Sequence, residues 1–587
     1  MPEAIRYRVT LPRPHNHRFE IEAEFPAAGE QLTVALPVWT PGSYLVREFS
    51  RHLQHVTATT LSGDRLPVTR IDKRSFRVTA RGQGVRLRYG VYANELTVRT
   101  SHLDGTHASF NGANLFLYDE ARRNVPHRVA IDVPAGWSVF TALEREGAEY
   151  VAADYDELVD SPFELGPHTA IEFEAAGVPH QFVVVGEPTP DPNRLAEETR
   201  QLVETEAALF GGLPADLKRY VFFLYMTDKG RGGLEHKAST ALLYPRGNLG
   251  SARGWEDLHN LIAHEYFHLW NVKRIKPRAF VPFDYAQENY TRLLWFFEGV
   301  TSYYDMLLTR RAGLTSAPRY LLRLGETLTA LHGTPGRKVQ SLEEASMQAW
   351  VKHYRPDENS PNSAISYYLK GEVVAWLLDL HLRRATGDQR SLDDVMRLLW
   401  QRYGDGRGVP EDGIEAAAAE VAGIDLSAFF DHALRSTEEL DYSVLSHIGL
   451  EAHFRVKESP SDKGGTPPRT RDGRPRGWLG LTARPSGTIS WVAEDSPAMN
   501  AGIYADDEVI AVDGFKVDGN GLIARAEDKA PGETLTVTLF RRDRLMEVEV
   551  TLGEKPQDAV YLTKVENPTP QQQASFAAWV GAPWSAE

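Results

Sequence analysis

Apolar and polar residues alternate in short runs over the first part of the chain, from Tyr7 to about Leu165. The clearest runs are Phe19 to Phe25, Leu32 to Val38 and Val85 to Tyr92. Clusters of Gly, Pro, Asn and Asp separate these runs, and alternation between such turn signals is typical of half-buried strands. The pattern predicts an antiparallel β domain over residues 1–168.

The pattern changes after this domain. Two strand-like runs, Gln181 to Val185 and Tyr220 to Tyr225, flank a helix-like stretch from Asn193 to Leu209. From Trp255 to about Leu440 the apolar residues follow a helical period instead. The segments with this period are Leu258–Val272, Tyr290–Ala312, Ser366–Thr386 and Ser391–Tyr403. We therefore predict an α/β unit followed by helices, together forming one domain over residues 169–445.

The chain beyond this domain divides into three further parts. Residues 446–477 become rich in Pro, Gly and charged side chains from Lys457 onward, which predicts a linker. Short strands around one helix resume over residues 478–555. Residues 556–587 combine Pro and Gln with a few aromatic residues and are interpreted as a tail. The predicted fold class is multidomain α+β.

Composition narrows the choice of partners. The chain of 587 residues has a net charge of −15 and no long basic run, which argues against nucleic acid as a partner. It has no Cys, so disulfides, thiolate metal ligands and Cys nucleophiles are excluded. The N-terminus lacks an apolar signal segment and no stretch has the length of a membrane span. We expect a cytoplasmic protein with no membrane partner that acts on peptides or small molecules.

One predicted helix carries the sequence His264-Glu265-Tyr266-Phe267-His268. Two histidines four positions apart share one helix face and can bind one Zn²⁺, while the intervening glutamate is placed to act as general base on water. The alternative is a histidine pair on an ordinary amphipathic helix. However, apolar residues surround the pair on almost every side, and buried imidazoles need a partner. The sequence therefore predicts a hydrolase with one Zn²⁺ per chain.

A zinc hydrolase needs a third protein ligand, and Glu298 is the best candidate. It is a lone acid in the strongly apolar stretch from Leu294 to Tyr304, where a solvated glutamate fits poorly. Glu288 and Asp305 are the next candidates. Asp305 is otherwise a candidate to hydrogen-bond a zinc-bound histidine.

Two short segments resemble motifs of the aminopeptidase N family of gluzincin metallopeptidases. Trp295 to Gly299 is similar to its W-x-x-E-G third-ligand motif, and Arg231 to His236 resembles its G-x-M-E-N motif. The second resemblance implies that Gly232 and Gly233 let a substrate backbone lie against a strand edge, and that Glu235 binds the α-amine. A turn or β-bulge that exposes a glutamate is the alternative.

A third segment, Ser366 to Gly371, is similar to the Y-x-K-G segment of that family, whose tyrosine stabilises the oxyanion. The resemblance assigns this role to Tyr368, with the adjacent Tyr367 as its competitor. A tyrosine that only packs against its helix is the alternative.

The C-terminal module resembles a PDZ domain. Trp478 to Leu481 is similar to the carboxylate-binding loop, in which backbone N–H groups of Leu479, Gly480 and Leu481 would hold a peptide C-terminus. The stretch Asp495 to Gly514 resembles the bacterial PDZ pattern. A module that only packs against the catalytic domain is the alternative.

Together with the segment Trp39 to Phe49, these motifs resemble the glycyl aminopeptidase family of PDZ-containing zinc metallopeptidases, over nearly the whole chain. The resemblance implies a thermolysin-like catalytic domain that releases N-terminal Gly, and less readily Ala, from peptides with a free N-terminus. Two other functions stay open: a gluzincin-type zinc endopeptidase with PDZ-recruited substrates, and a non-catalytic peptide-binding protein on a peptidase scaffold.

Overall fold

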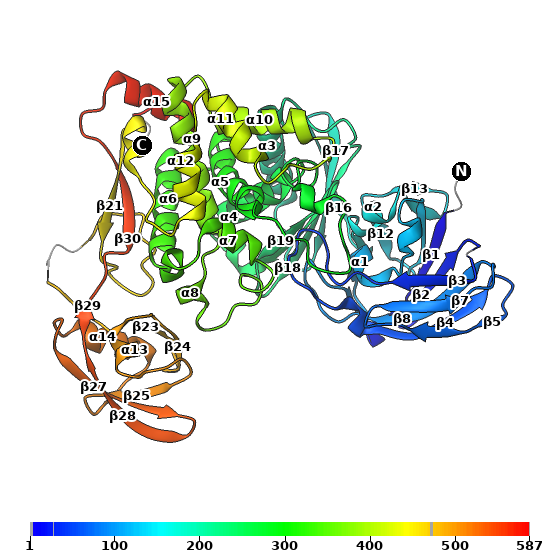
Figure 1. Ribbon diagram of the computed structural model, residues 1–587, viewed down its shortest axis with the longest axis horizontal. Helices are drawn as coiled ribbons and strands as arrows, with labels where there is room; N and C mark the ends of the chain where they lie inside the picture. The colour runs from blue at the N-terminus through cyan, green and yellow to red at the C-terminus, as the bar shows by residue number, and fades with distance from the viewer. Residues whose placement is uncertain (1–3, 28, 470–473, 586–587) are drawn as a thin grey trace. The chain divides into compact units, whose positions relative to one another are not determined.

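The computed structural model describes residues 4–27, 29–469 and 474–585 and contains two compact units (Figure 1). The first unit comprises Met1–Tyr290, Tyr304–Leu314 and Met396–Glu411. The second comprises Thr291–Tyr303, Thr315–Val395 and Asp412–Glu587. The multidomain α+β class is confirmed, with an N-terminal β domain and a helical region toward the C-terminus.

The N-terminal part of the first unit is built on an eight-stranded sheet with the order β13-β14-β11-β1-β2-β8-β4-β5. Its strands are β1 (Ile5–Thr10), β2 (Arg18–Phe25), β4 (Leu53–Thr60), β5 (Arg65–Leu66), β8 (Val85–Tyr92), β11 (His127–Asp132), β13 (Glu144–Glu146) and β14 (Glu149–Ala152). Burial alternates along β2, as predicted for a strand with one face in the core. One pair departs from the expected antiparallel pattern: β1 runs parallel to β11, which a long crossover connection permits.

Two smaller sheets complete this β domain. The order of the four-stranded sheet is β12-β15-β10-β9, and that of the three-stranded sheet is β3-β7-β6. Their strands are β3 (Gln31–Ala35), β6 (Val68–Arg70), β7 (Ser75–Thr79), β9 (His102–Leu103), β10 (Ala108–Phe110), β12 (Ser138–Phe140) and β15 (Phe163–Gly166). Side chains of all three sheets share one hydrophobic core.

A five-stranded sheet with the order β16-β17-β18-β20-β19 follows in the same unit. Its strands are β16 (Ala170–Ala175), β17 (Val178–Val185), β18 (Tyr220–Thr227), β19 (Gly232–Glu235) and β20 (Ser239–Pro245). The central strand β18 is buried over nearly its full length, because it runs parallel to both neighbours inside the sheet. Strand β19 lies at one edge, antiparallel to β20, and no further strand of the described chain pairs with its other side.

Two helices of this unit match the sequence pattern closely. They are α3 (Pro192–Phe210), capped by Asp191, and α4 (Ala252–Phe267), capped by Ser251. The pattern predicts the second helix through Val272, but it ends at Phe267, with His268 as its C-cap. The chain then turns at Val272, whose φ of +113° is strained for a β-branched residue.

Helices dominate the second unit. They include α6 (Ala317–His332), α7 (Leu342–Met347), α8 (Ser360–Ser363), α9 (Tyr367–Thr386), α11 (Gly413–Ala422) and α12 (Ser427–Phe430). The helix predicted over Tyr290–Ala312 begins only with the π-helical turn η6 (Trp295–Val300), which continues directly into α5 (Thr301–Arg311). The helix predicted over Ser391–Tyr403 is α10 (Leu392–Tyr403).

Helices η6 and α9 meet at two glycines. A Cβ atom built on Gly299 would lie 2.5 Å from the Gly371 Cα, and one built on Gly371 would lie 2.7 Å from the Trp295 carbonyl oxygen. Only residues without a side chain fit at this distance, so the two backbones are in direct contact.

The segments interpreted as linker and tail contain regular structure. Strand β21 (Leu450–Arg455) lies within residues 446–477 and pairs with β30 (Ala559–Lys564) from residues 556–587. Helix α15 (Pro570–Val580) follows, and its Trp579 is fully buried and donates a hydrogen bond to the Tyr303 hydroxyl at 3.0 Å. These segments therefore belong to the folded second unit, because their apolar residues contribute to its core. Residues 470–473 and 586–587 lie outside the described part of the chain.

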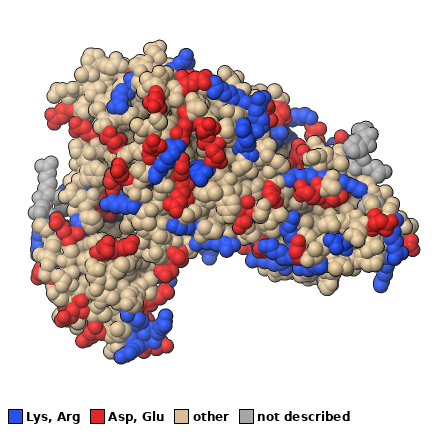
Figure 2. Space-filling model, viewed as in Figure 1, with Lys and Arg blue, Asp and Glu red and all other residues tan. Residues whose placement is uncertain are grey.

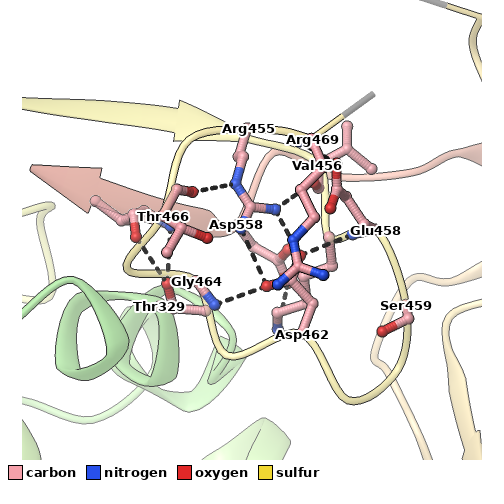
Figure 3. Close-up of polar contacts among 12 residues, drawn as sticks. Thr329, Arg455, Val456, Glu458, Ser459, Asp462, Gly464, Thr466, Arg469 and Asp558 are labelled. Atoms are coloured by element: carbon pink, nitrogen blue, oxygen red, sulfur yellow. Dashed lines mark hydrogen bonds and ion pairs between the residues drawn. The ribbon is translucent and has the colours of Figure 1, made fainter. Parts of the chain in front are cut away.

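The Pro/Gly-rich turn after β21 is held by polar contacts that Figure 3 shows. Arg455 donates to both carboxylate oxygens of Asp462, at 2.5 Å and 3.0 Å, and to the Thr466 carbonyl at 2.9 Å. Asp462 also accepts the backbone N–H of Gly464 at 2.8 Å. Thr329 of α6 accepts the Val560 N–H at 2.8 Å, so the strand pair is attached to the helices. The two parallel hydrogen bonds of the Arg455–Asp462 ion pair restrict the backbone conformation of this glycine-rich segment.

The C-terminal module has its own hydrophobic core. It contains a four-stranded sheet with the order β26-β25-β27-β28, the two-stranded sheet β23-β24, and the pair β22-β29. The strands are β22 (Gly477–Trp478), β23 (Leu481–Ala483), β24 (Ile489–Val492), β25 (Glu508–Val512), β26 (Phe515–Lys516), β27 (Thr534–Arg541), β28 (Arg544–Thr551) and β29 (Gly553–Glu554). Two helices accompany them where the sequence pattern predicts one: α13 (Pro497–Asn500) and α14 (Gly519–Glu527).

The surface carries both charges. Figure 2 shows Lys and Arg side chains interspersed with Asp and Glu over the visible face. Neither sign of charge forms a continuous patch over that face. Among the described helices, none combines the length and the apolar character that a membrane crossing requires.

Candidate active site

Helix α4 presents His264, Glu265 and His268 together, as the spacing predicts. The Nδ1 atom of His264 lies 3.0 Å from Asp305 Oδ2, and that of His268 lies 2.7 Å from the Asn271 carbonyl oxygen. The two rings are nearly perpendicular, with centroids 4.8 Å apart. These two Nδ1 contacts fix the orientation of the rings. Asp305, considered as a residue that hydrogen-bonds a zinc-bound histidine, contacts His264.

A buried glutamate that the sequence analysis missed lies behind this pair. Glu206 of α3 is fully buried, and neither carboxylate oxygen has a hydrogen-bond partner among the described residues. Burial raises its pKa well above the ordinary value, and the Asp305 carboxylate raises it further, while His264 acts in the opposite direction. A neutral Glu206 therefore adds no second negative charge beside Asp305. Its signal in the sequence is an acid on the apolar face of an amphipathic helix, between Leu202 and Leu209.

The edge strand β19 brings Gly232, Gly233 and Glu235 beside the motif helix. A Cβ atom built on Gly233 would lie 2.0 Å from Glu265 Oε1, so the Glu265 carboxylate fills the space that a side chain would take. Ligand atoms of Glu235, Glu265 and His268 all lie within 4.8 Å of one another. A glycine at position 233 is thus needed for the Glu265 carboxylate to lie against the strand.

Glu235 is buried, with 4 % of its surface exposed, and its Oε1 atom has no hydrogen-bond partner within the described residues. A loop of the N-terminal β domain packs onto this carboxylate. A Cβ atom built on Gly42 of that loop would lie 2.6 Å from Glu235 Oε1, and the Gly42 φ is +87°. Both constraints require glycine at position 42. The segment around Trp39 that the sequence analysis singled out therefore forms one wall of the site.

Two further residues that sequence reasoning missed hold this strand. Arg99 donates to the Gly233 carbonyl oxygen at 3.1 Å. Asp160 accepts the Lys237 N–H at 2.8 Å and contacts His236 Nδ1 at 3.2 Å and Lys273 Nζ at 2.5 Å. Burial acts upward on the pKa of Asp160, but Lys273 and His236 together outweigh it and hold this pKa far below its usual range. Asp160 thereby connects the residues after Glu235 to the loop after α4.

The remaining predicted site residues belong to the second unit. Glu298 lies on the π-helical turn η6, and 2 % of its surface is exposed. Burial lowers the pKa of His353, and the negative charge of Glu298 partly offsets this. The Tyr368 ring packs on His353 with centroids 5.4 Å apart, and Tyr367 packs on both. Within this unit the structure brings the candidate third ligand and the candidate oxyanion donor to one cluster. Tyr367 is buried and Tyr368 half-buried.

The predicted carboxylate loop of the C-terminal module is partly engaged within the module. The Leu479 and Gly480 carbonyl oxygens accept the N–H groups of Ala498 at 2.9 Å and Ala493 at 2.8 Å. Gly480 has a φ of +76° and touches Ser496. Leu481 opens β23, which pairs with β24 alone in a two-stranded sheet of the described chain. One edge of β23 is therefore geometrically suited to an added strand.

Comparisons with known proteins agree with this architecture. A family model described as Peptidase M61 N-terminal domain matches residues 6–167, and one described as M61 glycyl aminopeptidase matches residues 257–374. A solved structure of an aminopeptidase N family protein from Idiomarina loihiensis is 34% identical, with a TM-score of 0.92 over 98% of this chain and 100% of that chain.

Two weaker likenesses cover less. An M1 zinc metallopeptidase from Deinococcus radiodurans is 14% identical, with a TM-score of 0.46 over 75% of this chain and 94% of that chain. A probable periplasmic serine endoprotease DegP-like from Brucella suis is 35% identical over 81 residues, which are 14% of this chain. This match spans only 16% of the length of that protein.

Proposed function

Since the chain belongs to the M61 glycyl aminopeptidase family, we propose that it is a zinc-dependent aminopeptidase that prefers peptides with N-terminal Gly or Ala. The observation that carries the exopeptidase assignment is Glu235. Its buried carboxylate lies beside Glu265 and His268, with an oxygen that no described residue binds. A substrate ammonium is the group that such a carboxylate would hold.

His264, His268 and Glu298 would bind the zinc ion, because two imidazoles and one carboxylate are the donor set of many catalytic zinc sites. The Nδ1 contacts of both histidines support this assignment. The ion would act as a Lewis acid on the scissile carbonyl and lower the pKa of water.

Glu265 would accept the proton of the attacking water and pass it to the leaving amine. Glu265 lies on α4, and its carboxylate is held in position for this role by contact with Gly233. Tyr368 would donate a hydrogen bond from its hydroxyl to the oxyanion. Between the two neighbouring tyrosines, Tyr368 is favoured because it is half-buried and so more accessible, whereas Tyr367 is buried.

Glu235 would anchor the α-ammonium and so fix the distance from the N-terminus to the bond that is cut. The Gly42 loop packs directly onto the Glu235 carboxylate and so holds it in place. Gly232 and Gly233 would let the substrate backbone lie along the edge strand β19. The free edge of β23 supports a peptide-binding PDZ role for the C-terminal module.

A panel of aminoacyl anilides and N-acetylated peptides, assayed with and without a zinc chelator, tests this function. We expect chelator-sensitive release of N-terminal Gly and Ala, with blocked peptides cleaved poorly. In Glu235→Ala, kcat/KM for free amines should fall by roughly two to three orders of magnitude, because a charge-assisted contact worth about 2–4 kcal/mol is lost. Zinc content should stay unchanged.

Asp405→Ala serves as the matched control, since this exposed acid pairs only locally with Arg407 and should leave kcat/KM unchanged. Efficient internal cleavage of blocked peptides by the wild type would instead establish the endopeptidase alternative. Absence of any hydrolysis together with peptide binding would establish the non-catalytic one.

A further inference from the structure

A second group of metal-ligand side chains lies in the β-rich part of the first unit, outside the residues assigned to the active site. His107 immediately precedes β10, Glu164 lies on β15, and His168 follows β15. Each offers one ligand atom, and these atoms lie within 4.8 Å of one another. Two imidazoles and one carboxylate are the same donor set as that of the proposed catalytic site.

The three donors converge on one point. His107 Nδ1 lies 3.0 Å from Glu164 Oε1, and His168 Nε2 lies 2.8 Å from the same oxygen. Ligands bound to one tetrahedral zinc ion at about 2.0–2.2 Å are separated by roughly 3.3 Å. The two observed distances to Glu164 are within a few tenths of an ångström of this value, and the two imidazole nitrogens lie within 4.8 Å of each other.

The surrounding structure holds these side chains in place. A Cβ atom built on Gly166 would lie 2.3 Å from His168 Nε2, so the glycine lets the imidazole fold back onto Glu164. The second oxygen of Glu164 accepts the hydroxyl of Tyr225 at 3.0 Å. A polar partner on the outer oxygen of a ligating carboxylate is a common feature of metal sites. Tyr225 lies on β18, so the cluster joins β15 of the β domain to the five-stranded sheet.

The charge balance favours a cation. Glu164 is fully buried, and among the described residues its ion-pair partners are histidines rather than Lys or Arg. A buried carboxylate without positive charge nearby is costly. The cluster thus attracts either a proton or a metal ion.

A third imidazole lies beside this cluster. The His102 ring centroid is 4.8 Å from that of His107, and its Nε2 lies 3.2 Å from Asp104 Oδ2. Its Nδ1 is buried, and no described residue gives it a hydrogen-bond partner. The neighbourhood is therefore richer in nitrogen donors than one buried ion pair requires.

We propose that His107, Glu164 and His168 form a second, structural binding site for a divalent metal ion, with Zn²⁺ preferred by the donor set. The ion would stabilise the connection between the β domain and the sheet that carries β19. The inference does not depend on the proposed peptidase function, since none of its ligands takes part in that chemistry.

Metal stoichiometry tests the proposal on the full-length chain. Protein stripped with a chelator, reloaded with Zn²⁺ and dialysed against metal-free buffer should hold two zinc ions per chain in the wild type. The variant His264→Ala/His268→Ala leaves the cluster untouched and should retain one ion. Adding His168→Ala should remove that ion as well. Adding His381→Ala instead, a half-buried histidine of the second unit, should leave one ion bound.

Thermal unfolding gives a second readout. Added Zn²⁺ should raise the Tm of stripped His264→Ala/His268→Ala, because an ion that binds only the folded state stabilises it. Absence of zinc from this double variant, together with no Tm response to Zn²⁺, would overturn the proposal and leave a hydrogen-bonded His–Glu–His cluster. Both measurements stand even if His168→Ala fails to fold, because the deciding variant keeps all three ligands.

Discussion

The Glu265 carboxylate illustrates how one residue depends on another element of the same unit: α4 supplies it and Gly233 of β19 makes room for it. In Glu265→Gln the shape is kept, but the amide cannot accept a proton. We expect full zinc content and a loss of kcat of about two to four orders of magnitude, as for removal of a general base. Metal analysis beside kinetics checks both. Near-normal turnover would remove Glu265 from the mechanism.

The third zinc ligand is tested by Glu298→Ala. Two imidazoles alone bind zinc weakly, so zinc content should fall well below that of the wild type after dialysis. Glu288→Ala, a half-buried acid in the preceding loop, should retain the metal. If Glu298→Ala kept its zinc and Glu288→Ala lost it, the third ligand would be Glu288 instead of Glu298.

The sequence alone predicts those site residues that are marked by their spacing or by their neighbours in the chain. His264, Glu265 and His268 follow from the geometry of one helix, and the burial of Glu298 follows from its apolar neighbours. The missed residues, Glu206, Arg99 and Asp160, act through contacts between distant segments, and such contacts depend on tertiary packing that no local pattern encodes. Glu206 alone left a local signal, as an acid on an apolar helix face.

At the scale of elements, the contact between η6 and α9 fixes the spacing of Glu298 from the two tyrosines. In Gly371→Ala the new Cβ would lie 2.7 Å from the Trp295 carbonyl, so the helices must separate. We expect a stability loss of about 1–3 kcal/mol from overpacking, together with weaker zinc binding. Thermal unfolding and zinc titration measure these effects. Gly247→Ala, where nothing lies within 4 Å of the new atom, is the control and should change neither.

Most strands and helices were predictable, because alternation and helical period follow directly from burial on one face. The structure departs from the pattern at the segments interpreted as linker and tail. Glycine and proline are frequent in the first after β21, where the Arg455–Asp462 ion pair holds the turn. The second carries a recognisable start signal in Thr569 and Gln572, a capping box that the structure contains. Its apolar stretch was too brief to reveal a buried helix.

For the molecule as a whole, a variant that removes the Arg455–Asp462 ion pair tests whether the turn after β21 contributes to the free energy of unfolding. Hydrogen bonds from Arg455 lower the pKa of Asp462 more than burial raises it. Asp462→Ala should cost about 1–2 kcal/mol, a figure reduced for partial solvent screening, and lower Tm by roughly a few degrees at neutral pH. Asp405→Ala, which removes an exposed pair with Arg407, should leave Tm nearly unchanged.

The pH dependence of this difference has a definite sign. A carboxyl with a lowered pKa in the folded state contributes fully above its unfolded value of about 3.9 and loses that contribution as the pH falls through its folded value. The Tm gap between wild type and Asp462→Ala should therefore be constant near neutrality and shrink in acid. A gap that widened in acid would contradict the assignment of the ion pair.

The pairing of β21 with β30 places the two ends of the C-terminal module at neighbouring rungs of one ladder, with Arg455 opposite Ala559. In the topology of the chain, the residues between Arg455 and Ala559 form an insertion between the two strands of a β-hairpin. The two strands pair with each other on either side of this insertion. A tight turn could join the same two strands. A domain of another kind could therefore be inserted at this point without a change in the order of the strands and helices on either side, at the cost of the two hydrogen bonds that Asn362 of α8 makes with Val492 and Glu494 of the module.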